Sequence, residues 1–246
     1  MDLYFMAESP PCRAVLMVAE YLGLRLNLIS VDLTNNEQFS PQFSKINPFH
    51  CVPTLVDDGF VIWESRAIMT YLVEKFYKDH YLYPVNLRER PLIDQFLYFD
   101  GTQLYKAQTD YLAPYLSGRE PRLEDELKFR QKLVLLNQYL DGREYLATGH
   151  ITLADLSILA SLSFAEACRF DFRPYPCLVK WMERLKVQIP GYNRLNSEPM
   201  KRFSAYMQEK IEEVKQGKNE SESLGRVNFS SVWRKLVSGD SMQNSQ

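Results

Sequence analysis

Apolar residues in the first third of the chain follow strand spacing and helix spacing in turn. Residues 2–6 form a short apolar run that Pro10 and Pro11 interrupt. A helical stripe follows, made by Val15, Val18, Ala19 and Leu22. Gly23 ends this predicted helix, because glycine readily takes the left-handed conformation that closes helices. Residues 25–33 are again rich in apolar side chains, which predicts a strand buried on both faces.

Two further apolar runs, residues 52–56 and 60–63, flank the turn sequence Asp57-Asp58-Gly59. An Asp-Gly pair between two apolar runs predicts a β-hairpin, and therefore an antiparallel pair of strands. Helical spacing then returns over residues 65–76. Strand, helix, strand, hairpin and helix within residues 1–77 is the element order of a thioredoxin-like α/β domain.

Strand signals stop near residue 88, and long segments with helical spacing replace them. The predicted fold is therefore an α/β domain followed by an all-α domain. Residues 78–87 contain Pro84 and Asn86 and form a candidate linker, and residues 88–214 form the helical domain. The predicted helices cover residues 91–116, 124–140, 153–168, 178–187 and 198–214.

The third of these helices begins with a capping box. Thr152 occupies the N-cap and Asp155 the third helical position, with Ile151 and Leu156 placed to form a hydrophobic staple. A lone aspartate at such a position could also be read as catalytic. We interpret Asp155 as structural, because the capping box accounts for both polar side chains.

Composition and charge exclude several classes of protein. The chain has 246 residues, 46% of them hydrophobic, and a net charge of -2 from 29 basic and 31 acidic residues. This balance excludes a disordered chain and disfavours nucleic acid as a partner. The four cysteines form no C-x-x-C pair and the three histidines have no metal-ligand spacing, so we expect free thiols and no metal. With neither a signal peptide nor a membrane span evident, we expect a cytoplasmic protein.

Ser9 is the first candidate for chemistry, since it lies between the first predicted strand and the helix that follows. Ligands of open α/β sheets bind beyond the carboxyl ends of strands, beside helix N-termini. Pro10 and Pro11 have no N–H, so an anion there would meet the Ser9 hydroxyl, the amides of Cys12 and Arg13, and the helix dipole. Serine is also a common N-cap, and the sequence leaves both roles open.

Two other segments could contact the same ligand. A cis bond at Pro53 would turn the backbone N–H and C=O of Val52 outward, where an extended peptide could pair with them. At the next strand-to-helix junction, Ser65 and the free amides suit a carboxylate and Glu64 suits an ammonium group. Arg66 could clamp the same ligand or form an ordinary ion pair. Simple helix capping remains the alternative for this second segment.

Three motifs occur in a specific order: Ser-x-Pro-Cys-Arg at residues 9–13, Asn-Pro-Phe-His-Cys-Val-Pro-Thr-Leu at 47–55, and Trp-Glu-Ser-Arg-Ala-Ile at 63–68. Together they resemble the cytosolic glutathione transferases, specifically the insect delta and epsilon classes. The resemblance continues through residues 98–100, 104–105 and 153–155, and covers roughly residues 1–210. It implies a glutathione-binding thioredoxin-like domain, a helical domain with a hydrophobic substrate pocket, and a homodimer.

The resemblance implies an enzyme that conjugates the thiolate of glutathione to hydrophobic electrophiles such as xenobiotics, insecticides or lipid-peroxidation products. Glutathione is then a co-substrate, and no prosthetic group is expected. Two alternatives remain: a carrier that binds hydrophobic ligands with little turnover, and a glutathione-dependent isomerase or peroxidase.

The roles of individual residues also follow from the resemblance. Ser9 would donate a hydrogen bond to the glutathione sulfur, and Asp100 would support the γ-glutamyl end across the dimer interface. The other residues expected at glutathione are Gln38, His50, Cys51, Val52, cis-Pro53, Glu64, Ser65 and Arg66. The candidates for a substrate pocket between the domains are Tyr105, Tyr111, Leu112, Tyr115, Phe203 and Tyr206, and the sequence does not tell which of them belong to the core instead.

The chain departs from the family pattern at several positions. Glu8 and Pro10 stand where members often have glycine and a small residue, and an inward-pointing Glu8 would oppose a thiolate. Gln38 replaces a histidine that touches the glycyl carboxylate in many delta enzymes, which leaves His50 and the neutral amide of Gln38 for that role. These departures support the carrier alternative. We expect Cys12 to be helix packing and not a nucleophile, because burial raises the pKa of a thiol.

Residues 215–246 extend beyond the usual length of the family. Within this extension Phe229, Val232, Trp233 and Leu236 have helical spacing. Such a helix could dock on its own subunit or cap the substrate pocket, and the sequence does not decide between the two.

Overall fold

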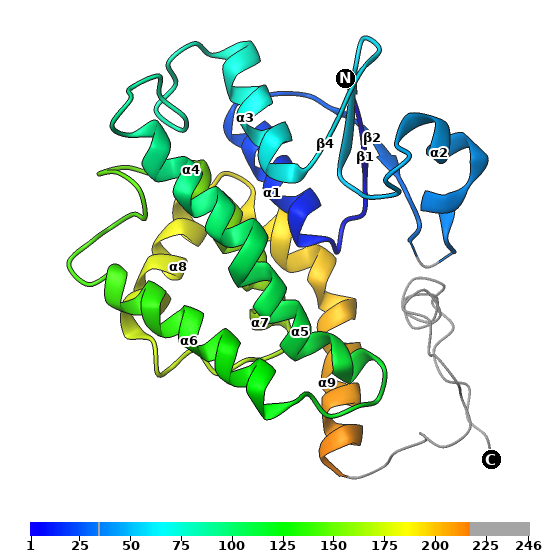
Figure 1. The fold of residues 1–246 in the computed structure, drawn as a ribbon, viewed down its shortest axis with the longest axis vertical. Helices are drawn as coiled ribbons and strands as arrows, with labels where there is room; N and C mark the ends of the chain where they lie inside the picture. Colours follow the sequence, from blue (N-terminus) through cyan, green and yellow to red (C-terminus); the bar gives the residue numbers. More distant parts are fainter. Residues whose placement is uncertain (34, 217–246) are drawn as a thin grey trace.

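Four strands form one mixed sheet in the described part of the computed structural model, residues 1–33 and 35–216. They are β1 (Asp2–Phe5), β2 (Asn27–Ser30), β3 (Thr54–Asp57) and β4 (Phe60–Trp63), in the order β2-β1-β3-β4 (Figure 1). β1 is parallel to β2 and antiparallel to β3, so that Leu3 lies opposite both Leu28 and Leu55. β3 and β4 form the predicted hairpin.

Two long helices accompany this sheet. α1 (Pro10–Tyr21) connects β1 to β2, and α3 (Ser65–Phe76) follows the hairpin. The two helices pack on each other, and Val15, Ile68 and Leu72 are fully buried in the resulting core. The short helix α2 (Pro41–Ile46) lies at the other side of the sheet (Figure 1), where the ring of Phe43 contacts Tyr4 with centroids 5.8 Å apart. The predicted thioredoxin-like order is confirmed.

The prediction that the second strand is buried on both faces is wrong. β2 is an edge strand, and Leu28 remains 48% exposed. The apolar run predicted the strand itself correctly. Apolar residues at a sheet edge nevertheless stay partly open to solvent, because no neighbouring strand or long helix covers them.

The second domain consists of helices, as predicted. They are α4 (Arg90–Phe99), α5 (Tyr105–Leu116), α6 (Leu123–Tyr139), α7 (Leu153–Ala167), α8 (Pro176–Gln188) and α9 (Glu198–Lys215). The predicted continuous helix over residues 91–116 is interrupted by a π-helical turn, η2 (Asp100–Leu104), between α4 and α5. A second π-helical turn, η3 (Asn193–Ser197), precedes α9. Such turns often mark functional positions in helices.

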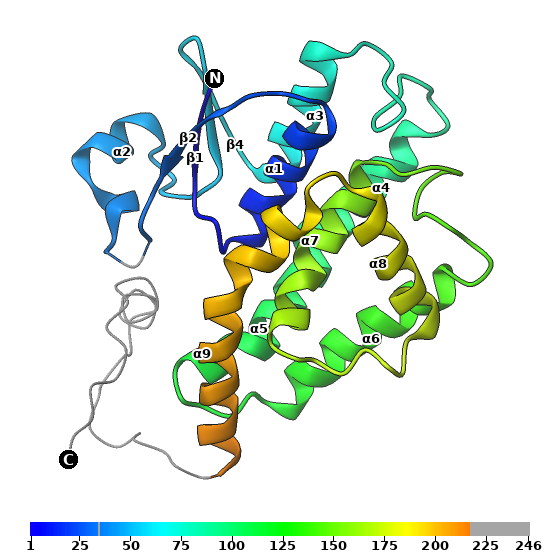
Figure 2. The ribbon, with the colours of Figure 1, turned by 180° about the vertical axis from the view of Figure 1, so that it is seen from behind.

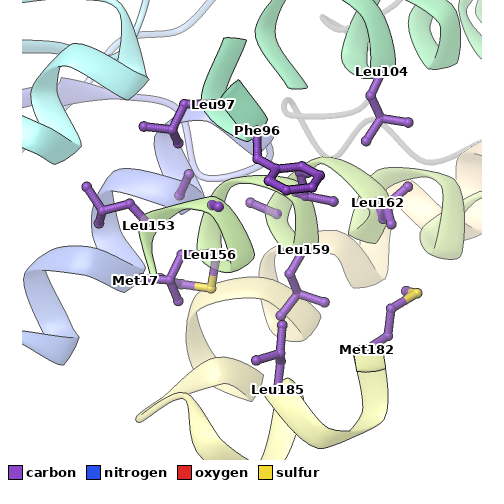
Figure 3. Packing of buried hydrophobic residues seen from close by; sticks show 14 of the residues in the cluster. Met17, Phe96, Leu97, Leu104, Leu153, Leu156, Leu159, Leu162, Met182 and Leu185 are labelled. Carbon is purple, nitrogen blue, oxygen red and sulfur yellow. The ribbon is translucent and has the colours of Figure 1, made fainter. Parts of the chain in front are cut away.

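Helix α7 is the centre of the helical domain. Leu153, Leu156, Leu159 and Leu162 are fully buried, and Figure 3 shows them among Phe96, Leu97, Met182 and Leu185. A helix that is apolar on nearly every face belongs inside a protein. α7 also contacts α1 of the first domain (Figure 2), where Met17 lies beside Leu156 (Figure 3). The two domains therefore share one continuous core.

The predicted capping box at the start of α7 is confirmed. Asp155 Oδ2 accepts hydrogen bonds from the Thr152 amide at 2.9 Å and from the Thr152 hydroxyl at 3.0 Å. Its Oδ1 accepts from the Leu146 amide and from the indole N–H of Trp181. With its acceptors used in this way, fully buried Asp155 is a structural residue.

Two findings concern the limits of the described chain. Between residues 1 and 216, Thr34 aside, no helix combines the length and apolar character needed to cross a membrane. The helix predicted from Phe229 to Leu236 lies outside the described residues.

Candidate functional site

Ser9 occupies the N-cap of α1 with an extended backbone, φ -74° and ψ 119°. Its carbonyl accepts the first helical hydrogen bond from the Arg13 amide at 3.0 Å. Within the described chain its side chain makes no capping hydrogen bond. Pro10 and Pro11 follow it, so two of the amides that start a helix are missing there. The hydroxyl therefore does not cap the helix backbone, although it lies close enough to the Cys12 thiol to lower the pKa of that thiol.

The loop before β3 lies at the same edge of the sheet as Ser9. Tyr4 pairs with Thr54 in an antiparallel register, so the residues just before Thr54 lie beside those just after Phe5. The Val52–Pro53 peptide bond is cis, as expected. Strand end, helix start and cis-proline thus converge on one place.

Asn47 holds this loop in shape, a role that sequence reasoning missed. It is fully buried, and its Nδ2 donates to Cys51 O at 3.1 Å and to Thr54 Oγ1 at 2.9 Å. Its Oδ1 accepts from the Phe49 amide. An asparagine whose side chain bonds backbone groups of the residues that follow it is a typical loop organiser, and Asn-Pro in the motif was the signal available.

His50 lies next along the loop, with a left-handed backbone at φ 54°. Its Nδ1 is 2.8 Å from the backbone carbonyl of Gln38, an acceptor, so Nδ1 carries the proton and Nε2 is the free nitrogen. The side-chain Oε1 of Gln38 is buried and has no hydrogen-bond partner among the described residues. Gln38 therefore positions His50 through its backbone, while its amide is turned inward.

Glu64, Ser65 and Arg66 form the start of α3. Glu64 takes a left-handed φ of 69°, an uncommon conformation for a side chain of this size, and Ser65 is buried. Arg66 Nη1 donates to Ser65 Oγ at 3.1 Å, and Arg66 Nη2 lies 2.5 Å from Asp100 Oδ2. Strained backbone at such a junction is typical of functional sites.

Asp100 differs from the role expected across a dimer interface. It is fully buried within its own chain, where Ser157 of α7 also donates to Oδ2 at 2.5 Å. The π-helical turn η2 begins at Asp100 and directs the carboxylate inward between α3 and α7. With no exposed surface, Asp100 pairs with Arg66 of its own chain, and electrostatic support across a dimer interface stays a prediction.

The structure separates the residues predicted to line the substrate pocket. Tyr105, at the start of α5, is close enough to Arg66 and Arg13 for their charges to counteract the rise in its pKa that burial causes. Tyr206 on α9 is half-buried, with the Lys210 ammonium 5.7 Å from its ring centroid. Tyr105 and Tyr206 thus remain the more accessible members of the predicted set.

The other members are packed inside the helical domain. Tyr111 stacks on Phe129 at 6.0 Å between centroids, and Phe203 contacts Phe164 at 5.0 Å. Leu112 and Tyr115 are buried as well. Two cavities, of ≈ 410 and ≈ 380 Å³, lie elsewhere, one between α7 and α9 and the other between α4 and α6.

Cys12 is fully buried in α1, and burial raises the pKa of its thiol to about 11, although the Ser9 hydroxyl and Arg13 act in the opposite direction. It is therefore a neutral thiol at physiological pH. This confirms packing over nucleophilic chemistry at Cys12.

Comparison with known proteins agrees with this geometry. The family model described as glutathione S-transferase, N-terminal domain, matches residues 1–74, and the model for the C-terminal domain matches residues 106–188. The chain belongs to the glutathione S-transferase family. It is 43% identical to glutathione S-transferase D6 of Drosophila melanogaster over 194 residues, which cover 78% of this chain and 90% of the relative.

Solved structures lead to the same class. A delta-class glutathione transferase of Nilaparvata lugens has 40% identity and a TM-score of 0.81, with 85% of this chain and 99% of that chain covered. An epsilon-class enzyme of Musca domestica has 33% identity and a TM-score of 0.78, covering 85% and 97%. A Bombyx mori glutathione transferase, solved as a complex with GTT, has 39% identity and a TM-score of 0.79, covering 85% and 96%. The chain is thus a transferase that acts on glutathione.

Proposed function

We propose that this enzyme conjugates the glutathione thiolate to hydrophobic electrophiles, and that the Ser9 hydroxyl stabilises that thiolate. One observation carries the proposal: Ser9 lies at the N-terminus of α1, beside the cis-Pro53 loop, with a hydroxyl that makes no capping bond to the helix backbone. A sulfur bound there would receive both a hydrogen bond and the field of the helix N-terminus.

The energies suffice for this role. A free thiol with a pKa near 8.5 is only about 3% thiolate at pH 7. Lowering that pKa by about two units requires roughly 2.7 kcal/mol of preference for the thiolate. A charge-assisted hydrogen bond supplies about 1.5–3 kcal/mol and a helix N-terminus about 0.3–1 kcal/mol. Since thiolate formation then gains only about 25-fold at pH 7, positioning of the electrophile must provide much of the remaining acceleration.

The rest of the tripeptide would lie along the loops described above. His50 would contact the glycyl end through Nε2, and the Val52 backbone, between Cys51 and cis-Pro53, would pair with the cysteinyl unit. Glu64, Ser65 and Arg66 would hold the γ-glutamyl end. The bonds from Arg66 to Ser65 and Asp100 support this assignment, because they fix the guanidinium before a ligand arrives.

Hydrophobic substrates would enter beside Tyr105 and Tyr206, between the domains. We also propose a homodimer that uses the face of α4 and α6, where Tyr98 is 72% exposed and Leu135 50% exposed around the ≈ 380 Å³ cavity. An exposed apolar patch of this kind suits a second copy of the chain. Four free cysteines support a reducing, cytoplasmic location.

Replacing Ser9 with alanine tests the proposal. We expect kcat/KM for a chromogenic aryl halide to fall roughly tenfold at pH 7, because the thiolate loses the hydrogen bond of Ser9 but keeps the field of the helix N-terminus. Ser9→Thr keeps a hydroxyl and serves as the matched control. An undiminished rate in Ser9→Ala would remove Ser9 from the mechanism.

The carrier alternative is favoured by Glu8, a carboxylate in the residue next to the proposed thiolate site. Steady-state turnover measured beside a titration with hydrophobic ligands separates the two functions. Tight ligand binding with negligible turnover across varied electrophiles would favour the carrier, and turnover that depends on Ser9 favours the enzyme.

A further inference from the structure

Arg13 is a fully buried cation at the boundary of the two domains. Its Nη1 donates to Ser163 Oγ of α7 at 2.7 Å and to Asn196 Oδ1 of η3 at 3.0 Å. These partners are neutral, and Nε has no partner among the described residues. Burying a charge against neutral groups is costly unless the charge acts on something else.

The position of Arg13 indicates that its charge acts at the turn that carries Ser9. Arg13 and Ser9 lie four residues apart at the start of α1, and the Arg13 amide donates to the Ser9 carbonyl. Helical side chains lean toward the helix N-terminus, and Arg13 follows this rule, since Nη2 approaches the Glu8 carbonyl at 3.5 Å. The guanidinium therefore lies behind the turn that presents the Ser9 hydroxyl.

The titratable groups close enough to Arg13 to affect its pKa come from four elements. Cys12 belongs to the same helix, Tyr105 to α5, Tyr192 to the segment before η3, and Glu8 to the loop before α1. Burial raises the pKa of Cys12, Tyr105 and Tyr192, so these three are neutral at physiological pH. Burial lowers the pKa of Arg13 to about 10, which still leaves it charged. Glu8, half-buried, is the acidic group of this set.

We propose that Arg13 and Glu8 form an opposed pair of charges that sets the acidity of the thiol held by Ser9. The positive field of Arg13 stabilises the thiolate, and the negative field of Glu8 holds part of that stabilisation back. Arg13 is thus a positioning residue that acts through space behind Ser9. A charge in the protein interior is screened less than a charge in solvent, so the field of Arg13 extends to the other side of the turn that carries Ser9. This inference rests on the proposed function of Ser9.

The experiment measures the ionisation of bound glutathione directly. Thiolate absorbs in the ultraviolet where the thiol does not, so a pH titration of the full chain saturated with glutathione gives the pKa of the bound thiol. In Glu8→Gln we expect that pKa to fall by about half a unit, which raises the thiolate fraction about threefold well below the pKa. The pH profile of kcat/KM should move by the same amount.

Asp58→Asn is the matched control for Glu8→Gln. It removes one negative charge from an exposed residue of the same domain, in the turn between β3 and β4. This turn is at the opposite end of the sheet, because Val56 pairs with Asp2 while Ser9 follows the other end of β1. We expect its titration to match the unmodified enzyme.

Arg13→Met should raise the pKa of the bound thiol by about one unit, and Arg13→Lys should restore most of that shift, because it restores the charge. Arg13→Met removes a buried group. If this variant does not fold, the titration of Glu8→Gln tests the proposal by itself. A downward shift in Glu8→Gln beyond that of Asp58→Asn supports the proposal.

Two results would contradict the proposed pair of charges, and one of them would also contradict the proposed function of Ser9. If the unmodified enzyme gives a thiolate signal and Glu8→Gln does not change the pKa of the bound thiol, the opposed pair of charges is refuted and the proposed function of Ser9 is not. Glutathione that binds without any thiolate signal overturns the proposed function of Ser9 as well.

Discussion

The Asp100 carboxylate links the proposed glutathione site to the centre of the helical domain. Its Oδ2 accepts from both Arg66 and Ser157, which lie on α3 and α7. Each contact joins residues that are far apart in sequence. The local sequence pattern could therefore identify Glu64, Ser65 and Arg66 as a group. It could not predict the contact with Ser157 or the inward direction of the Asp100 side chain.

Asp100→Asn tests this link. We expect the KM for glutathione to rise about tenfold while kcat changes little, because Arg66 loses its charged partner and holds the γ-glutamyl end less firmly. Initial-rate kinetics over a range of glutathione concentrations gives both constants.

Asp110→Asn is the control, since Asp110 is an exposed residue of α5 paired with Lys106. An equal change of KM in both variants, or a loss confined to kcat, would contradict the role given to Asp100.

At the scale of elements, local signals predicted those parts of the chain whose boundaries are set locally. The helix predicted over residues 65–76 has the observed bounds of α3, and Asp57-Asp58-Gly59 gave the hairpin. The exposure of β2 and the π-helical turn at Asp100 were not predicted. The first depends on strand order, and the second on side chains that neighbouring helices place around it.

The hairpin contacts α3 through the Asp57 carboxylate, and the ionisation of this group makes the stability of the fold depend on pH. Lys75 and Tyr71 of α3 both donate to Asp57 Oδ2 of β3, Tyr71 at 2.5 Å, and these bonds hold the pKa of Asp57 below its ordinary value. The unfolded chain then binds the proton more readily than the folded one. Asp57 therefore stabilises the fold above about pH 4, and this contribution disappears as the pH falls through the lowered pKa.

We expect Asp57→Asn to lower the urea midpoint at pH 7 and to flatten the loss of stability below pH 4. Urea unfolding at a series of pH values measures both effects. Asp58→Asn, one residue along in the exposed turn, should retain the pH dependence of the unmodified chain. A variant curve at Asp57 that runs parallel to the unmodified one would refute this linkage.

At the scale of the whole molecule, the two domains meet through α1 and α7, so the helix that follows Ser9 also packs against the helical domain. Sequence pattern predicted both domains, and the residues that the resemblance assigns to glutathione stay a prediction. It did not separate Tyr105 and Tyr206 from Tyr111, Leu112, Tyr115 and Phe203, because helical spacing alone does not tell core from pocket.

The structure of the enzyme with glutathione bound tests the central claim most directly. We predict the glutathione sulfur at hydrogen-bonding distance from Ser9 Oγ, about 3.0–3.5 Å, with the Val52 backbone paired to the cysteinyl unit and Arg66 beside the γ-glutamyl carboxylate. A sulfur that contacts a different hydroxyl, with Ser9 turned away from it, would contradict the account.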